Sequence, residues 1–429
     1  MSPSRSSTSA PALAPAAGAT GHRRVARCGW LLLACFLSHG ASAQEVPAGA
    51  ATTHGSRLTV AGEASVSAAT EDDAYFTYSS DAYGLLRLAR LDGSAVFRLG
   101  SRLSLLGDVR VQGAIGEGHW RARPYALFAR VRPWPQKAID IQAGLIPPVF
   151  GAFSRRAYGT DNPLIGFPLG YQYLTSLRPD ALPASADGLL ARRGQGWRVR
   201  YPLGNASPDH GVPLVDGLRY PVGVEVHAVV RPVEVSAAVT TGSLSIPDSR
   251  EVGRSPQVSG RIAVRPTAGL LVGASAARGT FFARSLAASA GSVAASGASD
   301  QRAVGFDAEY SRGYWLVRAE GILSNWRLPQ LDVRSLDGSL RAFAFDVEGR
   351  YRIRPGLYAA LRLDRLDFSE VCGSAACLPW DAPVRRVEVG GGYSIQRNVT
   401  VKAVYQQNWR NTTVRRVKGL ASAQLVVWF

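Results

Sequence analysis

Most of the chain alternates between apolar and polar residues with a period of two, which predicts β-strands rather than helices. The alternating runs come in pairs, and a short turn rich in Pro, Gly or Asn joins the two runs of each pair. Seven such turns fall at 100–101, 133–136, 231–232, 266–267, 312–313, 355–356 and 397–398. The chain is therefore predicted to be a series of antiparallel hairpins.

The segments between the hairpins are long and variable, and they cover residues 144–194, 242–255, 281–302, 328–340 and 369–383. Short turns at one end of the strands and long loops at the other are typical of transmembrane β-barrels. We predict an all-β fold, a single transmembrane antiparallel β-barrel over residues 44–429 with short periplasmic turns and long extracellular loops. The strand count is about sixteen, or eighteen if residues 187–202 form a further hairpin.

Tryptophans gather at both ends of the predicted strands, as amphipathic indole rings do at the two membrane interfaces. The short-turn end has Trp134, Trp315 and Trp428, and the long-loop end has Trp120, Trp326, Trp380 and Trp409.

The polar faces of several strands carry charges, and in "GRYRIRP" Arg350 and Arg352 lie opposite Tyr351 and Ile353. An arginine facing lipid at mid-bilayer costs ~2–4 kcal/mol, and a dry core could not hold many unpaired charges. The charged faces therefore predict a wet lumen, and barrels of this size leave an aqueous channel. The candidate pore-lining residues on strands are Arg110, Arg198, Arg200, Arg350, Arg352, Arg362 and Asp364.

The first 43 residues have the composition of a secretory signal peptide. Four arginines and no acidic residue precede the apolar run "GWLLLACFL", and small residues follow it. Cleavage is predicted after Ala43, and a lipoprotein cleavage site at Cys35 is the alternative. The four arginines are the only charges in residues 1–43, so the mature chain keeps +13 of the total net charge of +17.

Two cysteines, Cys372 and Cys377, remain after residue 43, in "VCGSAACLPW". Four small residues between them allow a tight disulfide loop, which suits an oxidising compartment. A metal site would need further Cys or His nearby, and the sequence offers none, so we predict a disulfide and no metal or cofactor.

The chain ends on "LASAQLVVWF", an alternating strand that stops on an aromatic residue. This ending resembles the C-terminal signal of bacterial outer-membrane β-barrels, in which the assembly machinery reads the terminal Phe, here Phe429. The mature chain is similar to a porin in architecture, and "IQAGLIPPVFGAF" (141–153) loosely resembles a strand-to-loop passage of phosphate-selective porins. The resemblance implies the outer membrane of a Gram-negative bacterium, contact with lipid and lipopolysaccharide, and a homo-oligomer.

These features favour a porin-like channel for passive diffusion of small hydrophilic solutes, with a bias for anions. Residues 144–194 are rich in Pro and aromatic residues and are a candidate constriction loop. Its arginines Arg155, Arg156 and Arg178 would then add to an anion-selective ring. The other interpretation places these arginines at the outer rim, paired with carboxylates or lipopolysaccharide phosphates. The alternative function is an exporter or scaffold barrel for an acidic polysaccharide or a periplasmic partner.

Enzymatic activity is not predicted. His227 lies mid-strand without a serine partner at fixed spacing, and no G-x-S-x-G elbow is present. The sequence also has no haem-attachment motif and no nucleotide-binding glycine loop. The basic charge is spread over strand faces, so a nucleic-acid partner is not predicted either.

Overall fold

The computed structural model describes residues 57–79, 84–114, 120–247, 256–282, 286, 300–328, 339–412 and 416–429. The predicted signal peptide, with Ala43 and Cys35, lies outside the described residues.

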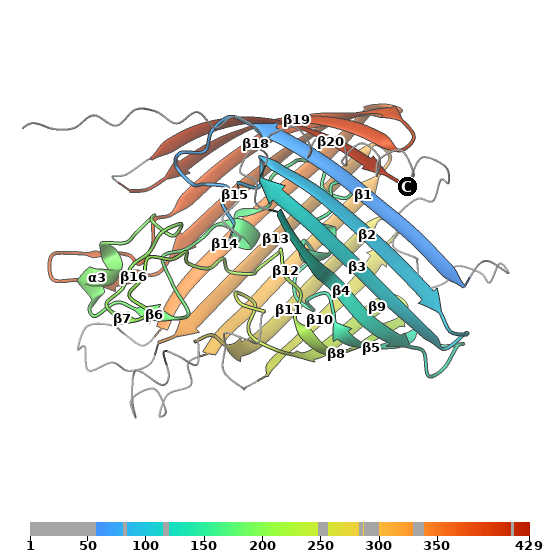
Figure 1. Cartoon of the computed structure of the whole chain (residues 1–429), viewed down its shortest axis with the longest axis horizontal. Coiled ribbons are helices and arrows are strands. Elements are labelled where there is room, and N and C mark those ends of the chain that lie inside the picture. The colour runs from blue at the N-terminus through green and yellow to red at the C-terminus, as the bar shows by residue number, and fades with distance from the viewer. Residues whose placement is uncertain are drawn as a thin grey trace, which may run out of the picture. The chain divides into compact units, whose positions relative to one another are not determined.

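Sixteen antiparallel strands form a closed barrel, in which β1 pairs with β20 (Figure 1). Each strand pairs with its neighbours in chain order, and the strands are β1 (Leu58–Ala69), β2 (Leu88–Arg98), β3 (Leu103–Ala114), β4 (Trp120–Val131), β5 (Ile139–Leu145), β8 (Val222–Val230), β9 (Val233–Thr240), β10 (Gln257–Thr267), β11 (Leu270–Thr280), β12 (Asp300–Arg312), β13 (Trp315–Arg327), β14 (Ser339–Arg354), β15 (Leu357–Phe368), β18 (Val384–Gln396), β19 (Val399–Arg410) and β20 (Val417–Trp428). The predicted transmembrane antiparallel barrel is confirmed.

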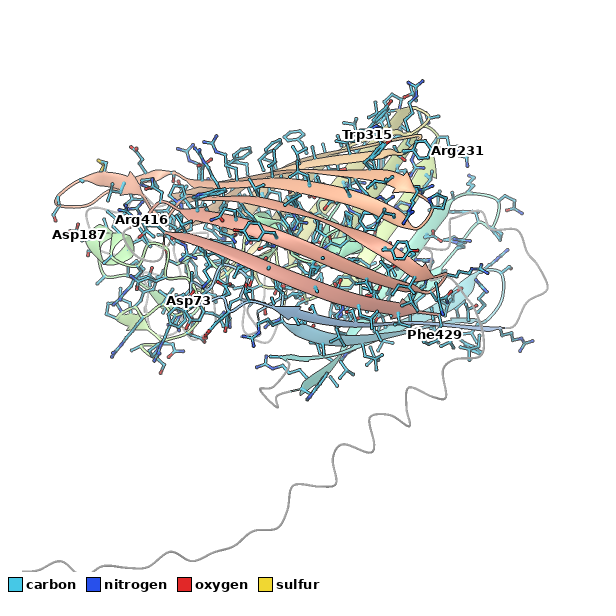
Figure 2. The ribbon with its side chains drawn as sticks, turned by 90° about the horizontal axis from the view of Figure 1, so that it is seen from above. Asp73, Asp187, Arg231, Trp315, Arg416 and Phe429 are labelled. Carbon is cyan, nitrogen blue, oxygen red and sulfur yellow. A yellow bond between two sulfur atoms is a disulfide. The ribbon has the colours of Figure 1, made fainter. Side chains whose placement is uncertain are left out.

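The connections differ at the two ends of the strands, as the sequence predicted. At one end, turns such as 231–232 and 313–314 join neighbouring strands, whereas residues 146–221 join β5 to β8 at the other. Figure 2 shows Arg231, Trp315 and Phe429 at the short-turn end and Asp187 and Arg416 at the opposite end. We call these the periplasmic and extracellular ends.

The strand count is sixteen, and residues 187–202 do not form the further hairpin that would have made it eighteen. They belong to the β5–β8 connection, where α3 (Ala186–Leu190) forms and Val199 makes only an isolated bridge with Asp209. The remaining short elements of this connection are η1 (Ser154–Arg156), α2 (Leu169–Gln172), β6 (Ala181–Leu182) and β7 (Leu203–Gly204). None of the helices in the described ranges is long and apolar enough to cross a membrane.

The outer surface of the barrel is apolar because one residue in two along each strand points outward. On β15, Leu361 and Leu363 are 44% and 47% exposed, whereas Arg362 between them is fully buried inside. Trp120, Trp315 and Trp409 are exposed at the ends of their strands, as expected for interfacial bands. Trp326 and Trp380 depart from that prediction, because both are buried and stack edge-on inside the barrel.

Phe429 completes the pairing of the first and last strands. Its backbone N–H donates to the carbonyl of Gly62 on β1 at 3.0 Å, and its carbonyl accepts from the Gly62 N–H at 3.2 Å. The aromatic ring covers Gly62, so a Cβ at that position would lie 2.4 Å from the ring. The pairing of the C-terminal strand with β1 therefore continues through Phe429.

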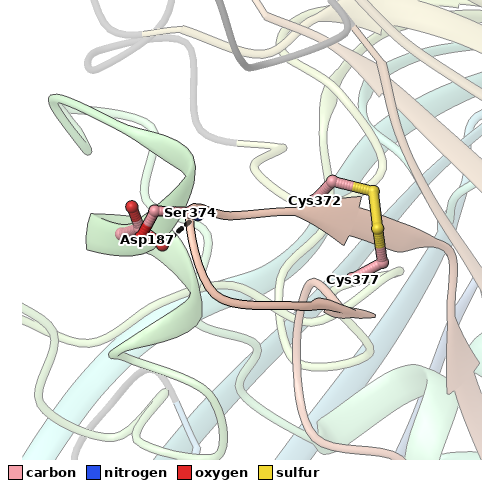
Figure 3. The surroundings of a disulfide bond; sticks show 4 residues. All are labelled: Asp187, Cys372, Ser374 and Cys377. Carbon is pink, nitrogen blue, oxygen red and sulfur yellow. Dashed lines mark hydrogen bonds between the residues drawn. A yellow bond between two sulfur atoms is a disulfide. The ribbon is translucent and has the colours of Figure 1, made fainter.

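The predicted disulfide between Cys372 and Cys377 closes a small hairpin between β15 and β18 (Figure 3). The hairpin consists of β16 (Glu370–Cys372) and β17 (Cys377–Pro379). Its tip touches α3, where the Asp187 carboxylate accepts a hydrogen bond from the Ser374 N–H at 2.9 Å. The hairpin thus links the extracellular end of the barrel wall to the β5–β8 connection.

Candidate functional site: the barrel lumen

We call the β5–β8 connection, residues 146–221, the lumen segment. Its first part packs inside the barrel against inward side chains of the wall, and α3, near its middle, lies at the extracellular end (Figure 2). Carboxylates on inward faces of the wall accept hydrogen bonds from the backbone of the segment. Glu63 on β1 accepts from Gly159 and Thr160, at 2.7 and 2.9 Å. Glu320, on the far side of the strand order on β13, accepts from Ala152 and Phe153, at 3.0 and 3.2 Å. Two more wall carboxylates bind it in the same way, Asp364 (to Leu169) and Glu388 (to Gly166).

Wall cations hold the carbonyl groups of the same segment. Arg362 on β15 donates to the Gly166 carbonyl at 2.7 Å, and Arg386 on β18 donates to that of Phe167 at 3.0 Å. Lys402 on β19 donates to the carbonyls of Gly159, Asn162 and Leu164. Arg90 on β2 donates to Ala157 at 2.8 Å, and Arg410 on β19 to Gly194 at 3.0 Å. Charged side chains therefore anchor this loop mainly through its backbone atoms.

The lumen segment also supplies a hydrophobic core inside the barrel. Phe150, Phe153, Phe167 and Tyr171 are buried together with the inward-facing Ile322 of β13. The ring of Phe153 lies 5.1 Å from each of the rings of Phe167 and Tyr171. Aromatic pairs at such distances contribute beyond the area they bury, so this core holds the segment in one conformation.

The barrel is packed at the level of the lumen segment. Each of the sixteen strands contributes at least one buried inward side chain, from Ser65 on β1 to Ser422 on β20. A cavity of about 20 Å³ between the segment and β1–β2 has room for one water molecule. We call this packed level the waist, and the part of the lumen on its periplasmic side the vestibule.

Arg362 is the centre of the largest charge cluster in the waist. It is fully buried and lies 3.3 Å from Glu348, 3.4 Å from Asp364 and in hydrogen-bond contact with Glu388. A second buried arginine, Arg110, lies 2.5 Å from Asp92 and stacks over a tyrosine ring. Such charges remain inside only because they are paired.

The candidate residues of the sequence divide into three places. Arg110, Arg362 and Asp364 are buried in the waist; Arg350 and Arg352 point inward near the periplasmic end of β14; and Arg155, Arg156, Arg178, Arg198 and Arg200 belong to the lumen segment. Within that segment, Arg198 and Arg200 are exposed, and Arg178 is buried against Asp180 at 2.8 Å. The proposed role of all ten in lining a pore stays a prediction.

Arg155 and Arg156 lie on the vestibule side of the waist. The Arg155 side chain is 36% exposed and 3.3 Å from Glu225, and Arg156 is 3.9 Å from Glu309 near the periplasmic end of β12. They therefore combine contact with the wall and access to solvent.

Sequence analysis missed most of the anchoring groups, namely Glu63, Arg90, Glu320, Arg386, Glu388, Lys402 and Asp381. The period-two pattern places the first six on inward faces, so the pattern held a usable signal. Asp381 lies in the β17–β18 connection and accepts from the backbone of Ser176 and Gly194, both at 2.6 Å. Burial raises the pKa of Asp381 above its usual range, although three backbone N–H groups donate to it.

Gly151 is one of the positions at which the lumen segment tolerates no side chain. Its φ is +64°, and a Cβ there would lie 2.1 Å from the Tyr171 hydroxyl and 2.2 Å from the Glu320 carboxylate. The Tyr171 hydroxyl donates to that same carboxylate. We expect Gly151→Ala to lower stability by about 1–2 kcal/mol from the backbone alone and to loosen the Glu320 anchor in addition.

The matched control is Gly313→Ala, because Gly313 has a φ of +60° and a Cβ there meets nothing within 4 Å. Heat-induced unfolding in detergent measures stability, and single-channel recording measures fluctuation of the lumen segment. Gly151→Ala should lower the unfolding temperature more than the control does and should cause more current fluctuation. Equal effects of the two variants would mean that the contact with Glu320 does not position the segment.

Comparison with solved structures identifies the class of this barrel. OmpF of Salmonella typhi, solved with daunomycin, matches with a TM-score of 0.53 at 11% identity, over 87% of this chain and 97% of that one. An anion-selective porin from Comamonas acidovorans matches with a TM-score of 0.53 at 10% identity, over 87% and 99%. The outer-membrane channel DcaP of Acinetobacter baumannii matches with a TM-score of 0.51 at 11% identity, over 87% and 97%.

The chain therefore has the fold of outer-membrane porins. No family model matches the sequence, and no curated protein matches it. At these identities the likeness concerns the fold alone.

Proposed function

We propose that this protein is a porin-like channel of a Gram-negative outer membrane, which passes small hydrophilic solutes, favours anions and has no enzymatic activity. The observation that carries the proposal is a closed barrel with an apolar outer face and a charged inner wall, constricted by the long loop between β5 and β8. Outer-membrane lipid, lipopolysaccharide and the assembly machinery are its partners in this proposal, and a homo-oligomer is its assembled form.

The bias for anions rests on the vestibule. Arg350 and Arg352 point inward at the periplasmic end of β14, and Arg354 follows them beyond a register shift in the β14–β15 pairing. None of the three forms an ion pair with a described residue. Arg318 on the neighbouring strand, by contrast, lies 2.8 Å from Glu309. Unpaired charges of one sign in a narrowing passage raise the local concentration of the opposite ion. Arg155 on the underside of the waist adds to the same field.

The decisive measurement is the conductance of refolded mature protein in a planar bilayer, with the reversal potential under a salt gradient. A channel whose reversal potential indicates anion preference supports the proposal. A folded, heat-modifiable barrel that never conducts contradicts passive diffusion.

We expect Arg350→Gln/Arg352→Gln/Arg354→Gln to reduce the anion-to-cation permeability ratio several-fold, because it removes three unpaired positive charges from the periplasmic end of β14, including the inward-facing Arg350 and Arg352. The matched control is Arg327→Gln/Arg341→Gln/Arg385→Gln, which removes the same charge from the outer surface. If native openings are too rare, both triples are compared in a variant without the lumen segment. If the permeability ratio fell equally in both triple variants, the selectivity would result from net charge rather than from the vestibule.

The packed waist is the observation that favours a second function. A barrel sealed by a buried charge network could open only when a partner or a substrate displaces the lumen segment, as an exporter or a scaffold barrel for an acidic polysaccharide or a periplasmic partner would. This alternative predicts no conductance from the protein alone, so the bilayer measurement separates the two.

A further inference from the structure

Six arginines point outward at the extracellular ends of six successive barrel strands. We call them the arginine belt, and they are Arg278 on β11, Arg302 on β12, Arg327 on β13, Arg341 on β14, Arg365 on β15 and Arg385 on β18. The alternation of exposed and buried residues puts each of them on the face that carries Val304, Leu323, Phe343 and Leu363, which are exposed apolar residues. The belt therefore borders the apolar surface of the barrel and lies outside the lumen.

Like charges in the belt lie directly opposite one another. The strand registers pair Arg278 with Arg302, and Arg365 with Arg385. Directly opposed like charges on neighbouring strands are destabilising unless an anion compensates them.

The described carboxylates compensate only part of the belt. Asp300 lies 2.5 Å from Arg278 and 3.0 Å from Arg302, and Asp367 pairs with Arg365. Arg327, Arg341 and Arg385 are exposed and form no ion pair with any residue that the structure describes. Six guanidinium groups thus face two carboxylates.

The height of the belt matches a membrane interface. On β14, ten residues separate Arg341 from Tyr351, which faces outward at the periplasmic end beside Trp315, 4.6 Å away between ring centroids. A rise of ~3.3 Å per residue and a strand tilt of ~40° place the two levels about 25 Å apart. The apolar band of a transmembrane barrel is ~25 Å tall. If the tyrosine marks the inner interface, the belt lies where lipid phosphates of the outer leaflet lie.

Within the described strands, the belt is confined to β11–β15 and β18. Corresponding outward positions elsewhere carry exposed apolar residues, among them Trp120 on β4, Val222 on β8, Val258 on β10 and Val417 on β20. A general requirement for positive charge at the extracellular rim would not produce this asymmetry, whereas recognition of a particular anion on one face would.

We propose that β11–β15 and β18 carry a binding surface for a phosphorylated glycolipid of the outer leaflet, whose phosphate groups the arginine belt binds. Guanidinium groups bind phosphate oxygens in a bidentate manner. The exposed side chains below the belt, such as Leu323, Phe343 and Phe345, would contact the acyl chains. The proposal depends on the outer-membrane location but not on channel activity, so conductance and lipid binding can fail independently.

The test uses refolded mature protein in detergent, with diphosphoryl lipid A as the probe and fully dephosphorylated lipid A and phosphatidylglycerol as comparisons. Native mass spectrometry counts the bound lipids, and the unfolding temperature follows their effect on stability. We expect the native protein to retain diphosphoryl lipid A in preference to both comparisons. Arg327→Gln/Arg341→Gln/Arg385→Gln should weaken this binding by roughly tenfold or more, since each basic residue near an anionic surface contributes about 1 kcal/mol.

The triple Arg350→Gln/Arg352→Gln/Arg354→Gln is the matched control, because it removes the same charge from the periplasmic end of β14, opposite the belt, and should bind like the native protein. Equal binding by the belt triple and the native protein would overturn the proposal, as would equal weakening in both triples. Retention of phosphatidylglycerol as tight as that of lipid A would show a general anionic-lipid surface and would also overturn it. A changed oligomeric state of the belt triple without loss of lipid A would assign the belt to a subunit interface instead.

Discussion

Removal of residues 147–220 is expected to raise single-channel conductance by roughly an order of magnitude or more, because an unfilled barrel of sixteen strands leaves an aqueous channel. The deletion would join Ile146 to Pro221 through an Asn-Gly turn. The Ile146 N–H already donates to the Pro221 carbonyl at 3.0 Å, and Leu145 pairs with Val222 in the β5–β8 register. A two-residue hairpin turn therefore fits this end of the two strands.

The shortened barrel should still fold, because all sixteen strands and the β1–β20 closure remain. Its exposed wall charges, including Glu63, Arg362 and Lys402, would be solvated by the water that replaces the segment. A heat-modifiable band on electrophoresis checks that the barrel has formed before conductance is recorded.

The control for this deletion removes residues 373–376, the tip of the disulfide-closed hairpin, and replaces Cys372 and Cys377 with Ser. It shortens another extracellular loop but leaves the waist intact, so its conductance should stay near the native value. Conductance that is the same in the native protein and the 147–220 deletion would mean that the lumen segment does not limit ion flow.

The barrel itself was predictable because a period of two decides both that a strand forms and which face it turns inward. Arg362 and Asp364 were assigned to the lumen on that basis, and both point inward. The disulfide was predictable because Cys372 and Cys377 are close in sequence. These features depend on residues within one strand or one short loop.

The packing of the lumen segment was not predictable, because its contacts join residues far apart in the chain. Glu63 binds Gly159 and Thr160, and Lys402 binds Asn162, yet nothing in the sequence links these positions. The wall side chains also bind backbone atoms, which every residue possesses, so the identity of a loop residue gives little information about its partner. Arg178 shows the consequence, since its nearest carboxylate is Asp180, two residues away in the segment itself.

Arg362→Met is expected to destabilise the barrel by about 3–5 kcal/mol, because it leaves buried carboxylates without their cation. The guanidinium contacts Glu348, Asp364 and Glu388, and it also donates to the Gly166 carbonyl of the lumen segment. The variant should therefore unfold at lower temperature in detergent and show noisier current, because the segment loses an anchor. Unfolding followed by heat modifiability and single-channel noise are the two measurements.

The control is Arg261→Met, since Arg261 is also an inward arginine and lies 2.5 Å from one carboxylate, Asp307. Arg261 is partly exposed and forms no hydrogen bond with the lumen segment among the described residues. The Arg261→Met variant should be less destabilised than Arg362→Met, and its current noise should equal that of the native protein. If the two variants behave alike, the anchoring role of Arg362 is wrong, and its contacts serve the wall alone.

Combining Arg362→Met with Glu388→Gln tests whether the two residues stabilise the lumen segment as a coupled pair or independently. The Glu388 carboxylate contacts Arg362 and accepts from the Gly166 N–H at 3.1 Å, so both residues hold the same point of the segment. Residues in one buried network show coupling energies of about 0.5–3 kcal/mol. The double variant Arg362→Met/Glu388→Gln should therefore be less destabilised than the sum of the single variants, because neutralising Glu388 removes one of the charges that Arg362→Met leaves unpaired. Strict additivity would mean that the two side chains anchor the segment independently.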